Sequence, residues 1–156
     1  MSNGPEEVIH ATCIALGGIG VLLLGPPGSG KSDLALRLID TAGIGTGKEM
    51  LTAQLVADDQ VKLSLADNHL IAEAPPVLAG FLEIRGLGIM RVPYLPSVRI
   101  GLVVQLRKQN AIERLPDLAA QHYRALGIAI PLVEIDAAAA SAPARVRAAV
   151  LHLATP

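Results

Sequence analysis

The chain has 156 residues and a mass of 16.2 kDa, a length that fits one domain. Thirteen Lys and Arg against fourteen Asp and Glu give a formal net charge of −1, so no overall positive field favours nucleic acid or an anionic membrane surface. With 51% hydrophobic and 17% charged residues, the composition excludes a disordered chain and predicts an aliphatic core. The single cysteine, Cys13, excludes an intramolecular disulfide and a multi-cysteine zinc site.

Residues 11–28 carry no charge, but they are too rich in glycine and proline for one lipid-exposed helix. The first ten residues contain Glu6 and Glu7 where a secretion signal requires positive charge. We therefore expect no membrane span, no signal peptide and a cytoplasmic protein.

The N-terminal third predicts two strands and a helix. Residues 9–16 and 21–24 are aliphatic runs separated by Gly17-Gly18, a pattern typical of two strands joined by a tight turn. From Lys31 the apolar residues recur with helical spacing, and Gly43 is expected to end that helix.

The middle of the chain predicts further strands. Residues 43–54 are expected to form an exposed loop, and 55–57 a strand that ends in two carboxylates. Residues 61–65 and 70–72 predict a second hairpin, and 82–85 another alternating strand closed by glycines.

The C-terminal third is expected to contain a buried strand over 102–106, a helix over 115–126 ended by Gly127, and a strand over 128–135. A last helix over 141–153 has Ser141 as its N-cap. This order predicts an α/β fold with a mixed sheet in one domain covering residues 1–156.

The segment between the second strand and the first helix matches the phosphate-binding pattern G-x-x-x-x-G-K-[ST] in full. Its residues are Gly25, Pro26, Pro27, Gly28, Ser29, Gly30, Lys31 and Ser32. Backbone N–H groups in such a loop converge on phosphate oxygens, the lysine reaches the β- and γ-phosphates, and the hydroxyl ligates Mg²⁺. The loop predicts a P-loop protein that binds a triphosphate or a similar polyphosphate.

Two adjacent carboxylates, Asp58 and Asp59, follow a short apolar strand. Adjacent side chains on an extended segment point in opposite directions, so one carboxylate can hold magnesium while the other accepts a proton from an incoming hydroxyl. A solvated turn is the alternative.

Other polar residues have plainer interpretations on spacing alone. Glu83 and Arg85 share one face of a strand and could form an ion pair. His10 lies in an aliphatic strand, where a satisfied core histidine is more common than a catalyst, and Arg114 fits a surface charge.

Taken together, IHATCIAL, GVLLLGPPGSGKSDLALRLID, LVADDQV, LEIRGLGIM and IERL resemble, in order, the catalytic C-terminal domain of the HPr(Ser) kinase/phosphorylase family. The segment LEIRGLGIM is the most specific because ordinary P-loop ATPases have no counterpart to it. The signature region of the family then contains Glu83, Arg85, Gly86 and Gly88.

The resemblance implies roles for individual residues. The loop from Gly25 to Ser32 would bind ATP, and Mg²⁺ would be held by Ser32 and Glu83, with Asp58 as a further expected ligand. Asp59 would accept the serine proton. The catalytic set would be His10, Lys31, Asp59 and Arg114.

The resemblance also implies a fold similar to phosphoenolpyruvate carboxykinase, an HPr-type phosphocarrier protein as partner, and a homo-oligomer, namely a hexamer. We expect the N-terminal domain of the family to be absent. The late Pro/Arg/Gly-rich stretch of the family corresponds here to residues 135–147, with Arg145 and Arg147 as candidate substitutes. Serine kinase activity is therefore the main expectation and reverse phosphorolysis the secondary one. A small-metabolite kinase and a nucleotide-sensing module without transfer activity are the alternatives.

Overall fold

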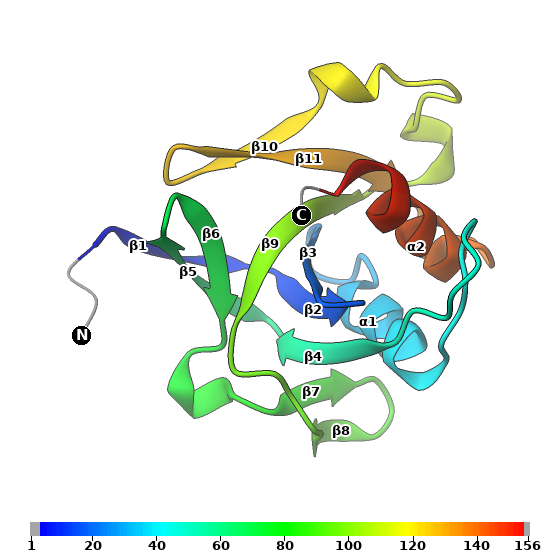
Figure 1. Cartoon of the computed structure of the whole chain (residues 1–156). Coiled ribbons are helices and arrows are strands. Elements are labelled where there is room, and N and C mark those ends of the chain that lie inside the picture. The colour runs from blue at the N-terminus through cyan, green and yellow to red at the C-terminus, as the bar shows by residue number, and fades with distance from the viewer. Residues whose placement is uncertain (1–3, 155–156) are drawn as a thin grey trace.

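The computed structural model describes residues 4–154, which form a curled mixed sheet with two helices packed on one side (Figure 1). The described strands are β1 (Glu6–His10), β2 (Thr12–Leu16), β3 (Ile19–Leu24), β4 (Ala53–Ala57), β5 (Gln60–Ala66), β6 (His69–Glu73), β7 (Phe81–Ile84), β8 (Gly88–Arg91), β9 (Val98–Leu106), β10 (His122–Ala125) and β11 (Ile128–Ile135). The helices are α1 (Lys31–Asp40) and α2 (Ala142–Leu153).

The main sheet has the strand order β1-β5-β6-β9-β3-β2-β4, with β11 beside the second half of β9 and β10 beside β11. Strand β9 runs parallel to β3 and β11, whereas the other pairs in this sheet are antiparallel. Strands β7 and β8 form a separate hairpin. The mixed α/β class predicted from the sequence is confirmed.

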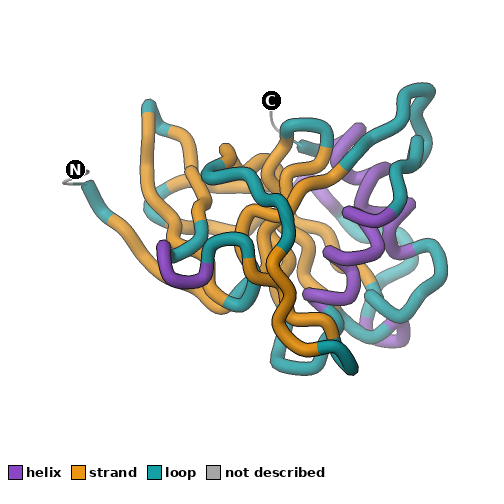
Figure 2. The backbone as a smooth tube through the Cα atoms, turned by 90° about the horizontal axis from the view of Figure 1, so that it is seen from below, coloured by secondary structure: helices purple, strands orange, loops and turns teal. Residues whose placement is uncertain are grey.

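Both faces of the central strands are covered, which explains why β2 and β3 read as nearly continuous apolar runs. One face, with Ile14, Leu23 and Val104, packs against Leu34 of α1 and Val146 of α2. Figure 2 shows the two helices together on one side of the strands. On the opposite face, a second apolar cluster lies beneath the strands that curl over the sheet.

One edge of the sheet gathers three chain segments that are distant in sequence. Strand β2 lies between β3 and β4 and runs antiparallel to both, so β3 and β4 run in the same direction. The end of β3 at Leu24, the start of β2 at Thr12 and the end of β4 at Ala57 therefore meet at this edge.

The helix expected over 115–126 is wrong. The chain forms a 3-10 turn at Leu118–Ala120 and then β10, which pairs antiparallel with β11. Leu126 and Gly127 both have positive φ, 49° and 81°, and make the tight turn of this hairpin. Gly127 thus reverses the chain instead of ending a helix, and pairing with β11 overrides the helical spacing.

Other boundaries also differ from the expectation. The strand expected over 9–16 is interrupted at Ala11, because β1 pairs with β5 whereas β2 pairs with β3 and β4. Helix α1 ends at Asp40, before Gly43, and Thr41 is its extended C-cap. A Cβ on Gly43 would lie 2.5 Å from a guanidinium nitrogen of Arg147, so this glycine makes room for α2 instead of capping α1.

The remaining expected elements are present. The two early hairpins, the strand before Asp58, the strand within β9 and the last helix all form. Strand β8 was not predicted. Within residues 4–154 no helix is long and apolar enough to cross a membrane.

Candidate active site

The glycine-rich segment connects the end of β3 to the first residue of α1, as the sequence pattern requires. Gly28 and Gly30 have φ of 81° and 96°, a left-handed conformation that side chains rarely adopt. The loop is closed by a 3.1 Å hydrogen bond from the N–H of Ser29 to the carbonyl of Pro26. In the described chain the N–H groups of Gly28, Gly30 and Lys31 have no protein acceptor. A nest of unpaired donors at a helix N-terminus is a site for an anion.

The side chain of Lys31 lies across this loop. Its ammonium group donates to the carbonyls of Gly25, at 2.6 Å, and Pro26, at 3.2 Å. The positive charge is therefore placed beside the same unpaired N–H groups. Both features favour a ligand with several negative oxygens.

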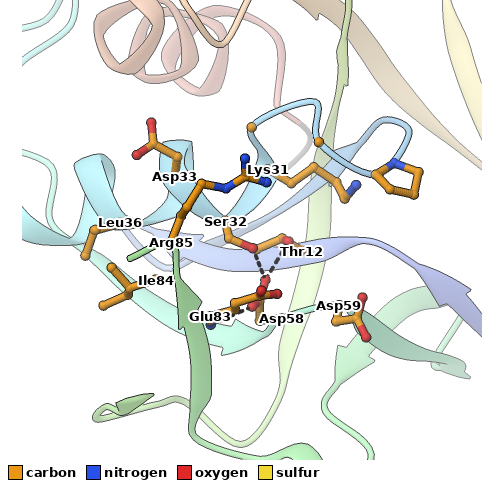
Figure 3. Close-up of a pocket in the computed structure, with 13 residues that line it drawn as sticks. Thr12, Lys31, Ser32, Asp33, Leu36, Asp58, Asp59, Glu83, Ile84 and Arg85 are labelled. Carbon is orange, nitrogen blue, oxygen red and sulfur yellow. Dashed lines mark hydrogen bonds between the residues drawn. The ribbon is translucent and has the colours of Figure 1, made fainter. Parts of the chain in front are cut away.

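Asp58 is the buried centre of the site, with only 6% of its surface exposed. One carboxylate oxygen accepts hydrogen bonds from the hydroxyls of Ser32, at 2.7 Å, and Thr12, at 2.9 Å. The other accepts a 3.0 Å hydrogen bond from the backbone N–H of Glu83. This one carboxylate connects the loop, the sheet edge and the β7–β8 hairpin, as Figure 3 shows.

Asp59 lies next to Asp58 but faces another way. Its φ is 70°, a left-handed value uncommon for a residue with a side chain. The prediction that this segment is extended is therefore wrong at Asp59. The two carboxylates still diverge: Asp58 points at Ser32 and Thr12, whereas Asp59 is exposed and points away from them (Figure 3). Both carboxylates line the same cavity.

The signature region forms the β7–β8 hairpin beside this cavity. Glu83 lies on β7, and Arg85 is in the turn that follows the strand, so the two do not share a strand face as expected. Within the described residues they form no ion pair. The guanidinium of Arg85 extends toward the glycine-rich loop (Figure 3). Gly86 and Gly88 have φ of 89° and 101° and allow the tight turn.

A cavity of about 460 Å³ is enclosed by the loop, the sheet edge and the hairpin. It brings together most of the predicted residues, namely Pro27, Gly28, Gly30, Lys31, Ser32, Asp58, Asp59, Glu83 and Arg85. Three residues of the loop do not line this cavity, namely Gly25, Pro26 and Ser29. They hold the loop together through the bonds from Lys31 to Gly25 and from Ser29 to Pro26.

His10 and Arg114 are placed differently. His10 is exposed at the end of β1, not buried in the core, and the β1–β5 register pairs it with Gln60, next to Asp59. Arg114 lies in an exposed segment after the 3-10 turn Gln109–Ala111. Neither residue lines this cavity, and their roles stay predictions.

Sequence reasoning missed Thr12, which is fully buried and bonded to Asp58. The available signal was a hydroxyl residue in a strand whose neighbours are all apolar. Asp33, Leu36 and Ile84 also line the cavity without having been predicted.

The donor set fits a hard divalent cation only together with a phosphate ligand. Within residues 4–154 no group of three or more His, Cys, Asp or Glu side chains is gathered as a metal site. Mg²⁺ binds through one or two carboxylates while phosphates and water fill the other positions. Asp58 and the hydroxyl of Ser32, beside the anion-binding loop, supply oxygen ligands of that kind.

The sequence of the chain matches the family described as the HPr Serine kinase C-terminal domain over residues 3–154. It is 36% identical over 147 residues to the HPr kinase/phosphorylase of Cupriavidus necator and 37% identical over 142 residues to that of Caldicellulosiruptor bescii. These alignments cover 88% and 84% of this chain but 42% of each relative, so the chain spans less than half their length.

A solved structure described as the HPr(Ser) kinase/phosphatase from Coxiella burnetii has a similar fold. The TM-score is 0.77 at 28% sequence identity, over 93% of this chain and 88% of that one.

Proposed function

Since the chain belongs to the HPr serine kinase C-terminal domain family, we propose that it is a Mg²⁺- and ATP-dependent kinase that phosphorylates a serine of an HPr-type phosphocarrier. The observation that carries the proposal is the contact of Ser32 with Asp58 beneath the glycine-rich loop, with Asp59 on the same cavity. We further propose that the fold is that of a P-loop kinase similar to phosphoenolpyruvate carboxykinase. The protein would act in the cytoplasm as a homo-oligomer.

The loop residues would bind the nucleotide through its phosphates. The unpaired N–H groups of Gly28, Gly30 and Lys31 would donate to phosphate oxygens. The Lys31 ammonium, held near the loop carbonyls, is within a side-chain rotation of the same region. Phosphoryl transfer depends on such positioning and charge neutralisation more than on covalent catalysis.

Ser32, Asp58 and Glu83 would hold the Mg²⁺ ion. When bound, the ion neutralises phosphate charge and aligns the transferred group. Asp58 would supply a fixed carboxylate, because Thr12 and the backbone N–H of Glu83 keep it in place. Ser32 would turn its hydroxyl hydrogen away from Asp58 so that the oxygen lone pair is free.

Asp59 would act as the proton acceptor. As the serine oxygen attacks the γ-phosphorus, its O–H bond breaks and the proton passes to the Asp59 carboxylate, while the bond from the γ-phosphorus to the bridging oxygen breaks and ADP leaves. The exposure of Asp59 leaves it accessible to a protein substrate. In the reverse direction the same carboxylate would return the proton to serine.

The other predicted residues, Arg85, His10 and Arg114, differ in how close they lie to the proposed reaction site. Arg85 extends toward the loop and would stabilise charge on the transferred group (Figure 3). His10 pairs across the β1–β5 ladder with Gln60, the residue that follows Asp59, and this is a suitable position beside the acceptor serine. Arg114 lies outside the cavity, and its proposed role rests on the resemblance alone.

The proposal is tested by incubating the protein with ATP, Mg²⁺ and an HPr-type carrier and mapping phosphoserine by mass spectrometry. The wild type should modify one serine, Lys31→Ala should weaken ATP binding, and Asp59→Asn should bind ATP normally but lose transfer by at least about a hundredfold. Transfer to small metabolites in place of the carrier would identify a metabolite kinase. ATP binding without transfer to either acceptor would identify a sensor and overturn the proposal.

A further inference from the structure

A second cavity lies on the other side of the tip of the glycine-rich loop. Its volume is about 740 Å³, and it shares Pro27 and Gly28 with the first cavity. Anything bound along the loop can therefore extend from one cavity into the other.

The second cavity is built at the carboxyl ends of parallel strands. The loops that follow β3, β9 and β11 supply its walls, through residues of 26–29, 106–110 and 136–138. In open α/β sheets, ligands bind in the crevice outside the carboxyl ends of such strands. The crevice therefore has the position of a ligand site.

Asp136 fixes two of these walls relative to one another. One carboxylate oxygen accepts from the N–H of Ala138 and the other from the N–H of Gln109, both at 2.9 Å. These two hydrogen bonds lower the pKa of the Asp136 carboxyl below its ordinary range. The hydrogen bond from Ala138 has the larger effect. The bridge keeps the cavity open between the loops after β9 and β11.

The lining combines apolar walls, amide groups and three charged residues, namely Arg107, which is paired with Glu134 at 2.7 Å, Lys108 and Asp136. Leu106, Ala137 and Pro26 are apolar, while Gln109 and Asn110 carry amides. The hydroxyl of Ser29 is buried and has no hydrogen-bond partner in the described chain. A flat heterocycle with polar edges and an attached sugar suits the apolar walls and the amides of this lining.

We propose that the second cavity holds the nucleoside, base and ribose, of the nucleotide whose phosphates bind the loop. This inference rests on the proposed function, because it takes the loop as the phosphate site. Asp136 then acts as a positioning residue for the walls. The amides of Gln109 and Asn110 carry both hydrogen-bond donors and acceptors, so these two residues are the candidates to bind the edge of the base.

The test compares ATP with inorganic tripolyphosphate, which has the phosphates without the nucleoside. Binding is measured by isothermal titration calorimetry with Mg²⁺ for the wild type and for Ala138→Leu, whose larger side chain enters the cavity. Ala140→Leu, on the same exposed loop but outside the lining, is the matched control. A second arm irradiates the wild type with 8-azido-ATP and maps the adducts that excess ATP prevents.

We expect Ala138→Leu to weaken ATP binding at least fivefold, with tripolyphosphate binding within twofold of wild type and Ala140→Leu unchanged. Adducts should fall within residues 106–110 or 136–138. Unchanged ATP affinity in Ala138→Leu, or the absence of ATP-protected adducts from both segments, overturns the inference. If Ala138→Leu weakens both ligands, the loop itself has moved and the adduct positions in the wild type decide. Failure of wild type to bind tripolyphosphate would instead count against the proposed function.

Discussion

The hydroxyl of Ser32 donates a 2.7 Å hydrogen bond to the carboxylate of Asp58, 26 residues further along the chain. Ser32 lies in the first turn of α1, and Asp58 directly follows β4. The contact exists because β3 and β4 run in the same direction on either side of β2, so the segments that follow them meet at one edge. It makes the glycine-rich loop and the carboxylate one unit.

Thr12→Val should destabilise the fold and loosen Asp58. The variant keeps the shape of the buried side chain but removes one hydroxyl donor to the carboxylate. We expect a loss of about 1–3 kcal/mol in the free energy of unfolding, measured by urea denaturation, because the hydrogen bond is buried and charge-assisted. Thr12→Ser retains the donor and should recover the Mg²⁺-dependent ATP affinity that Thr12→Val loses. Equal ATP affinity in Thr12→Val and wild type would show that Thr12 does not position Asp58.

Arg147→Ala should affect stability and not the nucleotide site. Arg147 is buried on α2, and its guanidinium donates to the carbonyl of Thr41, which holds the segment after α1. Removing it should cost about 2–4 kcal/mol, because a cavity forms and a carbonyl loses its donor. Arg145→Ala, a change at an exposed residue on the same helix, should stay within about 0.5 kcal/mol of wild type.

This variant also tests an expectation from the sequence, in which Arg147 was a candidate substitute for residues of the phosphorolysis reaction. The structure places Arg147 beneath residues 43–45, outside the lining of both cavities. ATP affinity of folded Arg147→Ala, measured by calorimetry, should equal that of wild type. A large loss of ATP affinity with the stability intact would restore the functional interpretation.

Cys13 should make the fold less stable at alkaline pH. Burial raises the pKa of this thiol far above its ordinary value of 9.0. Above pH 9.0 the unfolded chain therefore releases the thiol proton while the folded chain keeps it. The free energy of unfolding is unaffected by the titration of this group below pH 9.0 and decreases as the pH rises above that value. The slope should approach about 1.4 kcal/mol per pH unit.

The measurement compares urea denaturation of wild type and Cys13→Ala between pH 8 and pH 11. The variant has no thiol to titrate, so the difference in the pH dependence of the two proteins isolates Cys13. Parallel curves for the two proteins across this range would contradict the prediction.

Sequence patterns predicted the local parts of the site and missed the parts made by the fold. The loop from Gly25 to Ser32 is recognisable because its spacing and its strand-to-helix context are both local. The importance of Thr12 follows only from the β2–β3–β4 pairing, which no local pattern encodes. The same limit explains β10, where hairpin pairing with β11 outweighs helical spacing.

The second cavity was also beyond the sequence. Residues 106–110 and 136–138 carry no motif, and they meet because β9 and β11 are parallel and Asp136 bonds to both loops. Residues that belong to a local motif were predicted, and most of them line the first cavity, whereas Thr12 and Asp136, which hold other residues in place, were not predicted.

The central claim is that Asp58 holds a metal ion against the phosphates bound by the loop. Calorimetric titration of ATP into wild type and Asp58→Asn, each with Mg²⁺ and with EDTA, tests it most directly. Asp40→Asn, at an exposed position at the end of α1, controls for the loss of a charge. The account predicts that Mg²⁺ strengthens ATP binding to wild type and Asp40→Asn by at least about tenfold, and that Asp58→Asn loses most of this gain while metal-free binding stays within about twofold. An equal gain from Mg²⁺ in wild type and Asp58→Asn would contradict it.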